Sequence, residues 1–292
     1  MPGAGHMSVR RKESLTGLAF IMPGLFGFLI FFALPFVKSI YYCFTRGVGK
    51  IEFCGVRNFA ELFGSGPYRL SVVNTLRFNI IAVTLLMLAS FFLALLLRRS
   101  FKGREIFNTS FIFPLVIPVA SIVLFWRIVF HEDGALNLFL GSAGLHKISL
   151  SENGCPMLIL VLLYMWKNCG YNVVLFTAGL AGIPEEYYES ARIDGAGRLS
   201  CLINITLPYI MPSAFFVFII SMVNSFKVFR EAYLLAGSYP DRSIYMLQHF
   251  MNNNFTNLNY QKLSTAAFIM ALFVYLLVLF LLRAERKFEK NL

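Results

Sequence analysis

Long apolar runs alternate with short polar connections along the whole chain. A bilayer core takes about 20 residues of helix, and six runs are long enough to cross it. Six such runs in 292 residues leave too little polar surface to cover them in a water-soluble fold. The pattern therefore predicts an all-α membrane protein with six transmembrane helices. The runs cover about 15–44, 71–97, 106–130, 156–182, 209–230 and 264–283.

The composition is that of an embedded protein. Apolar residues make up 58% of the chain and charged residues 14%, whereas soluble domains are about half apolar and a quarter charged. The formal net charge of +11 is a balance that can indicate nucleic-acid binding. Here, however, Lys and Arg stand in short clusters beside the apolar runs, and no basic stretch is interleaved with stacking aromatics. This distribution is typical of membrane proteins, and no nucleic-acid partner is expected.

The basic clusters also predict the orientation. If six helices alternate, the clusters fall on one side with segment 184–208, while the opposite connections at 45–70, 131–155 and 231–263 are longer and hold fewer basic residues. Basic residues favour the cytoplasmic side, so both termini and segment 184–208 are expected there. The clusters contain Arg10, Arg11 and Lys12; Arg98, Arg99, Lys102 and Arg104; and Arg283, Arg286, Lys287 and Lys290.

These assignments divide the chain into five parts. Residues 1–14 form a cytoplasmic segment, whose first six resemble a remnant of an expression tag, and no cleavable signal peptide is expected. Residues 15–44 are the first transmembrane helix, and 45–70 an extracytoplasmic loop. Residues 71–283 form a five-helix core that includes loop 184–208, and 284–292 are a basic cytoplasmic tail. Five scattered cysteines predict no metal site, and whether Cys54 and Cys155 pair across the outer loops stays open.

The segment PEEYYESARIDGAGRLSCLINITLP, residues 184–208, is a polar interruption in an apolar chain. Pro184 suits the first turn of a helix, and the carboxylates that follow suit the positive end of its dipole. The run Asp194-Gly195-Ala196-Gly197 predicts a stop and a turn. A second short helix at about 198–206 then leads to Leu207-Pro208, where the next span is expected to begin. The segment is predicted to be a helix–turn–helix elbow at the membrane surface, and a purely connecting role remains an alternative.

The spacing within this elbow resembles the EAA loop of binding-protein-dependent ABC importer permeases. That pattern is EAA, three residues, G, nine residues, I, one residue, LP, and here Ser190 replaces the first alanine. The extended form IPEEYYESARIDGA is similar to that of the carbohydrate-uptake branch, which includes the maltose, oligosaccharide and glycerol-phosphate permeases. GVRNFAELF at 55–63 and the stretch before the elbow also fit, while loop 131–155 fits least. The matching coupling residues are Glu189, Ser190, Ala191, Asp194, Gly195, Ile205, Leu207 and Pro208.

The resemblance implies a role within an assembly in a bacterial or archaeal cytoplasmic membrane. In this family the elbow docks on a cytoplasmic ATPase. The implied partners are a second permease subunit, two ABC ATPase subunits, an extracytoplasmic solute-binding protein and membrane lipid. ATP and Mg would bind to the ATPases, and no cofactor to this chain.

The resemblance also implies a translocation site in the fourth and fifth spans. In register with the elbow, its polar residues are Tyr164, Lys167, Asn168, Ser221, Asn224, Ser225 and Lys227. Amides and hydroxyls match the hydroxyls of a sugar, although the same groups also tie transmembrane helices together. If Lys167 and Lys227 both line the path, the solute is expected to be acidic.

Other functions have less support in the sequence. Gly47-Val48-Gly49-Lys50 is followed by Ile51 and lacks the first glycine of a phosphate-binding loop. No catalytic Ser–His–Asp, Cys–His or metal-binding motif is present, so the chain is predicted to be a transport subunit and not an enzyme. The alternatives are an ABC permease for an amino acid, peptide or glycerol phosphate, or a secondary transporter. The last would predict an inverted repeat, and none is apparent.

Overall fold

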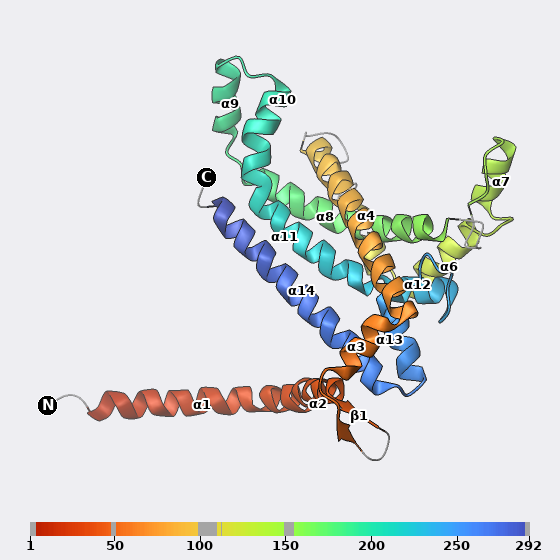
Figure 1. The fold of residues 1–292 in the computed structure, drawn as a ribbon. Helices are drawn as coiled ribbons and strands as arrows, with labels where there is room; N and C mark the ends of the chain where they lie inside the picture. The colour runs from red at the N-terminus through yellow and green to blue at the C-terminus, as the bar shows by residue number, and fades with distance from the viewer. Residues whose placement is uncertain (1–3, 48–50, 99–109, 112, 149–154, 290–292) are drawn as a thin grey trace.

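The computed structural model describes residues 4–47, 51–98, 110–111, 113–148 and 155–289 (Figure 1). Side chains are described from Thr16 to Lys287 within those ranges. Several residues used in the sequence analysis therefore lie outside the described part. These are 1–3, Val48 to Lys50, Arg99, Lys102, Arg104 and Lys290, with the side chains of Arg10, Arg11 and Lys12.

Nearly all the regular structure described is helical, as predicted. Five helices are long and apolar enough to cross a membrane: Thr16–Cys43, Gly66–Leu97, Pro156–Ala181, Arg198–Ala236 and Tyr260–Lys287. They correspond to five of the six predicted spans. For the third, residues 106–109 and 112 are outside the described part, and the described helix α6 (Val119–Val129) has 11 residues. The all-α membrane fold is thus observed, with five candidate spans and a shorter apolar helix among the described residues.

Three of the spans are single α-helices. They are α4 (Gly66–Leu97), α8 (Pro156–Ala181) and α14 (Tyr260–Glu289). The other two contain changes of winding. The first span runs through α1 (Ala4–Phe28), the π-turn η1 (Leu29–Ala33) and α2 (Leu34–Cys43). The helix Arg198–Ala236, which was predicted as the fifth of six spans and keeps that number here, is also composite. It runs through α10 (Arg198–Cys201), the π-turn η2 (Leu202–Thr206), α11 (Leu207–Ser225), the 3-10 turn η3 (Phe226–Val228) and α12 (Phe229–Ala236).

The connections predicted as outer loops contain structure of their own. Strand β1 (Thr45–Arg46) pairs antiparallel with β2 (Glu52–Phe53), and α3 (Arg57–Gly64) follows. Farther along lie α7 (Ala135–Ser142) and α13 (Leu247–Thr256). The hydropathy pattern did not predict these short elements. Both α3 and α13 pack on α4 and α14, and α7 packs on α6. Cys54 and Cys155 are both free thiols, so they do not pair.

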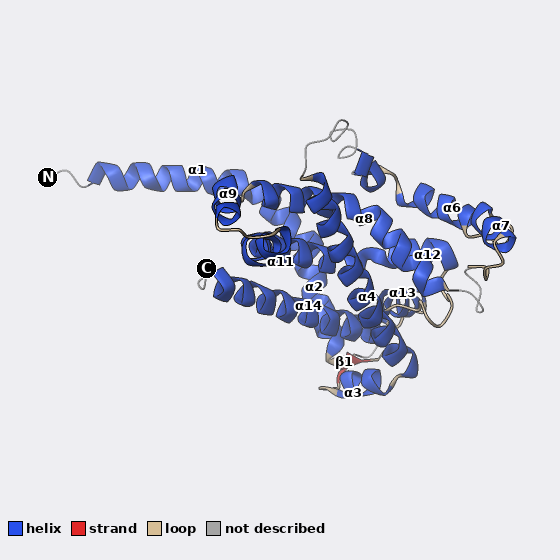
Figure 2. Cartoon of the chain, turned by 90° about the horizontal axis from the view of Figure 1, so that it is seen from above, coloured by secondary structure: helices blue, strands red, loops and turns tan. Residues whose placement is uncertain are grey.

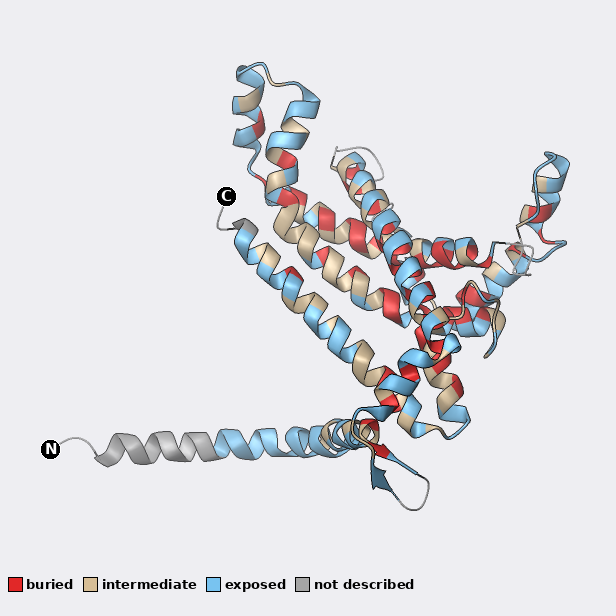
Figure 3. Cartoon of the chain, in the orientation of Figure 1, coloured by how far each residue is buried: buried red, intermediate tan, exposed pale blue. Residues whose placement is uncertain are grey.

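The first span stands away from the other helices (Figures 1 and 3). No residue in its most apolar window is buried, and Phe20 and Phe31 are 83% and 75% exposed. Its α2 end packs on the bundle, against α14. Such an arm is stable only in hydrocarbon or against another protein.

Among the remaining spans, α4 and α8 share the largest helix contact and α11 packs on both, while α14 packs on α11 and α13 (Figure 2). Phe78 and Leu86 of α4 and Leu160 and Leu163 of α8 are fully buried in one apolar cluster with side chains from α6 and α12. A second cluster joins α4, α8 and α11 near the elbow. The elbow, the Leu97 end of α4 and the C-terminal end of α14 lie at one end of the bundle, while α3, β1 and α13 lie at the other (Figure 1).

Candidate coupling and translocation sites

The elbow begins with a regular helix, α9 (Glu185–Ile193), as the sequence predicted. Pro184 precedes it as the N-cap residue, Glu185 and Glu186 occupy its first turn, and Arg192 its last. Each charge therefore has the sign that stabilises its end of the helix dipole.

A glycine-dependent turn ends α9. Gly195 has φ +81°, its N–H bonds to Arg192 O at 3.1 Å, and the Ala196 N–H bonds to Ala191 O at 2.8 Å. These two bonds form a Schellman motif, which needs a left-handed residue after the helix. A Cβ added at Gly195 would meet nothing within 4 Å, so glycine is required here for its backbone conformation and not for lack of space.

The second half of the elbow continues directly into the fifth span. The short helix predicted at about 198–206 is not a separate element, because the helix is unbroken from Arg198 through α11. Pro208 has no N–H to donate to the preceding turn, and the wide π-turn Leu202–Thr206 lies immediately before it. A displacement of the elbow therefore acts on a continuous helix.

Contacts made by one tyrosine and one arginine hold α9 in place. Tyr188 is 5% exposed, and its hydroxyl lies 3.0 Å from the Thr206 hydroxyl on the second half of the elbow. The guanidinium of Arg98, at the end of α4, lies 4.1 Å from the Tyr188 ring centroid. The same side chain donates to Glu185 Oε2 at 2.9 Å. The sequence pattern predicts only a cytoplasmic position for Arg98 and does not reveal this role, because its partners are 87 and 90 residues away.

The free end of the elbow carries an exposed surface. Glu189, Ser190, Asp194 and Gly195 are all exposed there. Ile193 and Leu199, which the sequence analysis did not select, are 87% and 68% exposed. Apolar side chains around a carboxylate form a surface suited to another protein. Of the other predicted coupling residues, Ala191, Ile205 and Pro208 are half-buried and Leu207 is exposed, the last three in the helical stem.

Several of the predicted path residues meet between α8 and α11. Tyr164 is 3% exposed, and its hydroxyl donates to Ser221 O at 2.6 Å. Asn172, which is not one of the predicted path residues, donates to Ser221 Oγ at 2.7 Å. The Asn168 amide donates to Tyr164 O at 2.8 Å, within α8. These groups form a buried polar cluster that joins the two helices.

The remaining path residues have different surroundings. Lys167 Nζ lies 2.5 Å from Glu231 Oε1, in an ion pair between α8 and α12. Ser225 is buried and donates to Met222 O. Lys227 is exposed and donates to the half-buried Asn224 side chain at 3.4 Å. Lys227 and Asn224 are therefore not part of the Tyr164–Ser221 cluster.

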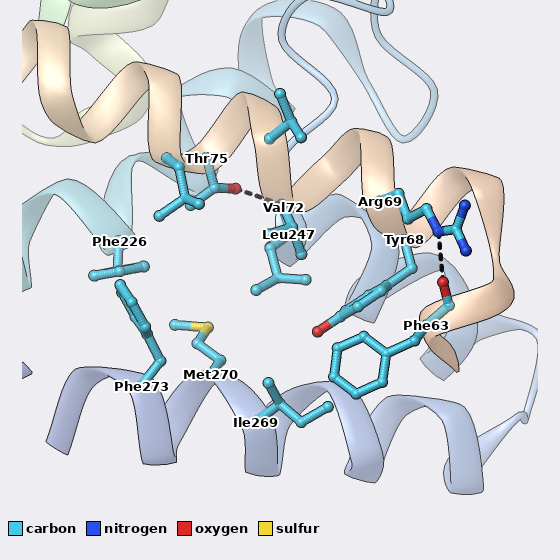
Figure 4. Close-up of a pocket in the computed structure, with 12 residues that line it drawn as sticks. Phe63, Tyr68, Arg69, Val72, Thr75, Phe226, Leu247, Ile269, Met270 and Phe273 are labelled. Atoms are coloured by element: carbon cyan, nitrogen blue, oxygen red, sulfur yellow. Dashed lines mark hydrogen bonds between the residues drawn. The ribbon is translucent and has the colours of Figure 1, made fainter. Parts of the chain in front are cut away.

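A cavity of about 410 Å³ lies between α4, α13 and α14 (Figure 4). Its walls are mainly apolar, with Val72, Leu247, Ile269 and Phe273 among them. Of the polar side chains on α4, Arg69 donates to Phe63 O, Thr75 accepts from Leu247 N, and Tyr68 contributes a hydroxyl (Figure 4). A sugar bound in this cavity would leave most of its own hydroxyls without hydrogen-bond partners. No predicted path residue lines the cavity.

The described residues contain no group of three or more His, Cys, Asp or Glu side chains placed to hold a metal ion. The chemical features of the molecule are thus an exposed elbow surface and a buried polar cluster between spans.

The chain matches the family described as "Binding-protein-dependent transport system inner membrane component" over residues 86–292. It is 34% identical over 232 residues to the "Probable ABC transporter permease protein YesP" of Bacillus subtilis, covering 77% of this chain and 75% of that protein. It is 30% identical over 224 residues to the "Arabinooligosaccharides transport system permease protein AraP" of the same organism, covering 74% and 70%.

A solved bacterial ABC transporter described as importing the acidic polysaccharide alginate has a similar chain, with a TM-score of 0.83, 21% identity and coverage of 97% and 99%. At that identity the likeness concerns the fold. The chain belongs to the family of inner membrane components of binding-protein-dependent transport systems. It is a multi-pass ABC transporter permease subunit and not an enzyme, and the resemblance found in the sequence is confirmed.

Proposed function

We propose that this chain is one of two transmembrane subunits of an ABC importer for a sugar or oligosaccharide, in a bacterial or archaeal cytoplasmic membrane. It has six spans and cytoplasmic termini, and forms half of the translocation path. A solute-binding protein delivers the solute from outside. The observation that carries the proposal is the elbow, whose exposed Glu189, Ile193 and Leu199 surround a turn fixed by Gly195.

The elbow is proposed to dock on a cytoplasmic ABC ATPase. ATP and Mg bind to the two ATPases, and their closure moves the elbow as a rigid body. The Arg98 and Tyr188 contacts support this role, because they tie α9 to both α4 and the stem of α11. The movement then reaches the second, fourth and fifth spans together.

The solute path is proposed to pass the polar cluster of Tyr164, Asn168 and Ser221. Hydroxyl and amide groups there serve as both donors and acceptors, which suits the hydroxyls of a sugar. AraP, whose name specifies arabinooligosaccharides, supports a carbohydrate as the solute class. Of the two lysines that would favour an acidic solute, Lys167 already has Glu231 as its partner.

Co-purification tests the docking proposal. The chain, its partner permease and a tagged ATPase subunit of the same transport system are expressed together, and recovery of the chain on the ATPase is measured. Glu189→Lys and Leu199→Asp are each expected to lower recovery at least fivefold, because each places an unfavourable charge on the docking surface.

Leu145→Asp is the matched control, since Leu145 is 58% exposed but lies beyond α7, outside the elbow. Its recovery should equal that of the wild type. Full recovery of both elbow variants would refute the docking role.

A further inference from the structure

Glu231 is an acidic residue almost fully enclosed among the spans. It lies in the first turn of α12, directly after the 3-10 turn that interrupts the fifth span. Only 4% of the residue is exposed. An ionisable group at such a position is costly unless it has partners, and it commonly marks a transport path.

Only half of the Glu231 carboxylate has a partner among the described residues. Oε1 lies 2.5 Å from Lys167 Nζ. Oε2 is buried with no hydrogen-bond partner in the described part of the chain. A buried acceptor left unpaired is destabilising, so Oε2 is a place where an additional donor is stabilising.

The unpaired Oε2 atom of Glu231 belongs to a carboxylate that lies close to predicted path residues. Lys167 lies three residues after Tyr164 on one helical face of α8, so the ion pair begins one turn from the Tyr164–Ser221 bond. Asn224 and Lys227 precede Glu231 on the same span, but a 3-10 turn lies between them, and Lys227 is exposed where Glu231 is buried. Through Lys167, Glu231 extends the polar cluster toward α12.

The ion pair also fixes the charge of this region. Lys167 and Glu231 together contribute one positive and one negative charge, at side-chain exposures of 18% and 6%. Their sum is zero. An anionic solute would gain little attraction from Lys167 while it is paired, whereas a neutral hydroxyl meets both an ammonium donor and a carboxylate acceptor.

We infer that Glu231 is a solute-contacting residue whose Oε2 accepts a hydrogen bond from a hydroxyl of an uncharged sugar. With Lys167 it forms a donor–acceptor pair of zero net charge, which selects neutral sugars over uronic acids. This inference rests on the proposed function and names the solute class of the same path.

The experiment uses the complete transporter, with both permeases, both ATPases and the binding protein, in proteoliposomes. The probes are two labelled oligosaccharides of equal length, neutral arabinotriose and acidic trigalacturonate. The wild type is expected to import arabinotriose at least tenfold faster than trigalacturonate. Uptake of neither would overturn both the proposed function and this inference, whereas a preference for trigalacturonate would overturn the inference alone.

Glu231→Gln leaves Lys167 without its counter-charge. The variant is expected to raise the KM for arabinotriose about tenfold and to reduce the neutral-to-acidic uptake ratio at least tenfold. Glu132→Gln, at an exposed outer position, is the matched control and should change neither quantity. An unchanged KM and ratio for Glu231→Gln would overturn the inference.

A purely structural ion pair makes a different prediction for the double variant Lys167→Met/Glu231→Met. Replacing a buried ion pair by apolar side chains of similar volume is often neutral for folding. If the pair only holds α8 to α12, the double variant should import arabinotriose as the wild type does, and this result would also overturn the inference. Solute contact instead predicts a wild-type melting temperature with a KM at least tenfold higher.

Discussion

The guanidinium of Arg98 lies 4.1 Å from the centroid of the Tyr188 ring, which joins the end of α4 to the middle of α9. The two residues are 90 positions apart in the sequence. Arg98 also pairs with Glu185 at 2.9 Å, and Tyr188 reaches Thr206. The contact therefore connects the second span to an elbow that the chain itself joins to the fourth and fifth.

Arg98→Gln should loosen α9 without unfolding the bundle. The cation–π contact and the ion pair are partly exposed, since the side chains of Arg98 and Glu185 are 29% and 56% accessible. Removing both contacts should lower the stability of the folded elbow by about 1 kcal/mol at such partly exposed sites. We expect the amount of solute imported per ATP hydrolysed to fall about threefold to tenfold in proteoliposomes, because ATPase movement reaches α4 less effectively.

Arg192→Gln is the control for this change. Arg192 is another arginine that contacts Glu185, at 3.6 Å, but its side chain is 67% exposed and belongs to α9 itself. Its removal should leave the ratio of transport to hydrolysis unchanged. Equal ratios for Arg98→Gln and the wild type would exclude a mechanical role for the Arg98 contact.

Gly195 and Gly197 make a matched pair in the same turn. Gly195 has φ +81°, where a Cβ costs about 1–2 kcal/mol, whereas Gly197 has φ −74° and an open surrounding. Gly195→Ala should therefore weaken recovery on the ATPase about fivefold or more, and Gly197→Ala should not. Gly195→Asn, a residue that tolerates this conformation, should restore part of the loss. Similar recovery for all three variants would contradict the role assigned to the turn.

The sequence predicted the parts of this molecule that depend on local pattern. Apolar runs located four of the five candidate spans to within five residues at each end, whereas the run predicted at 209–230 belongs to a helix that extends from Arg198 to Ala236. Pro184, Glu185 and Gly195 marked the elbow and its turn. Contacts between distant segments were beyond it. Glu231 pairs with Lys167 across 64 positions, so periodicity could not show that this lysine is neutralised or that Glu231 lies beside a predicted path residue. A carboxylate four residues after Lys227 was the available signal, and its significance depends on which helix faces it.

Buried His249 should make stability depend on pH. It is fully buried in α13, accepts from Met246 N at 3.2 Å, and packs against Phe229 and Tyr245. Burial lowers the pKa of His249 from 6.5 to about 4. Below about pH 6.5 the unfolded chain takes up a proton that the folded chain does not bind, so stability should fall as pH drops from 6.5 toward 4.

Melting temperatures of the purified protein in detergent at pH 7.5 and 5 measure this effect. His249→Phe removes the titrating group and should reduce the difference between the two values. His131→Phe, at an exposed histidine, should leave the difference as in the wild type. A pH dependence that is the same with and without His249 would refute the assignment.

Gly170 provides a test of packing in which the usual effect of a substitution changes sign. An alanine in the middle of a helix normally stabilises it by about 1 kcal/mol relative to glycine. At position 170 in α8, however, the added Cβ would fall on the main-chain carbonyl of Phe111, which lies against the helix there. Backbone cannot rotate away as a side chain does, so we expect Gly170→Ala to lower the melting temperature by several degrees and to impair transport.

Gly141→Ala is the matched comparison, because Gly141 is also helical, in α7, and nothing lies within 4 Å of an added Cβ. It should leave the melting temperature unchanged or raise it slightly. Thermal unfolding of the two variants side by side separates helix propensity from the crossing. If Gly170→Ala were as stable as Gly141→Ala, Phe111 would not lie against α8.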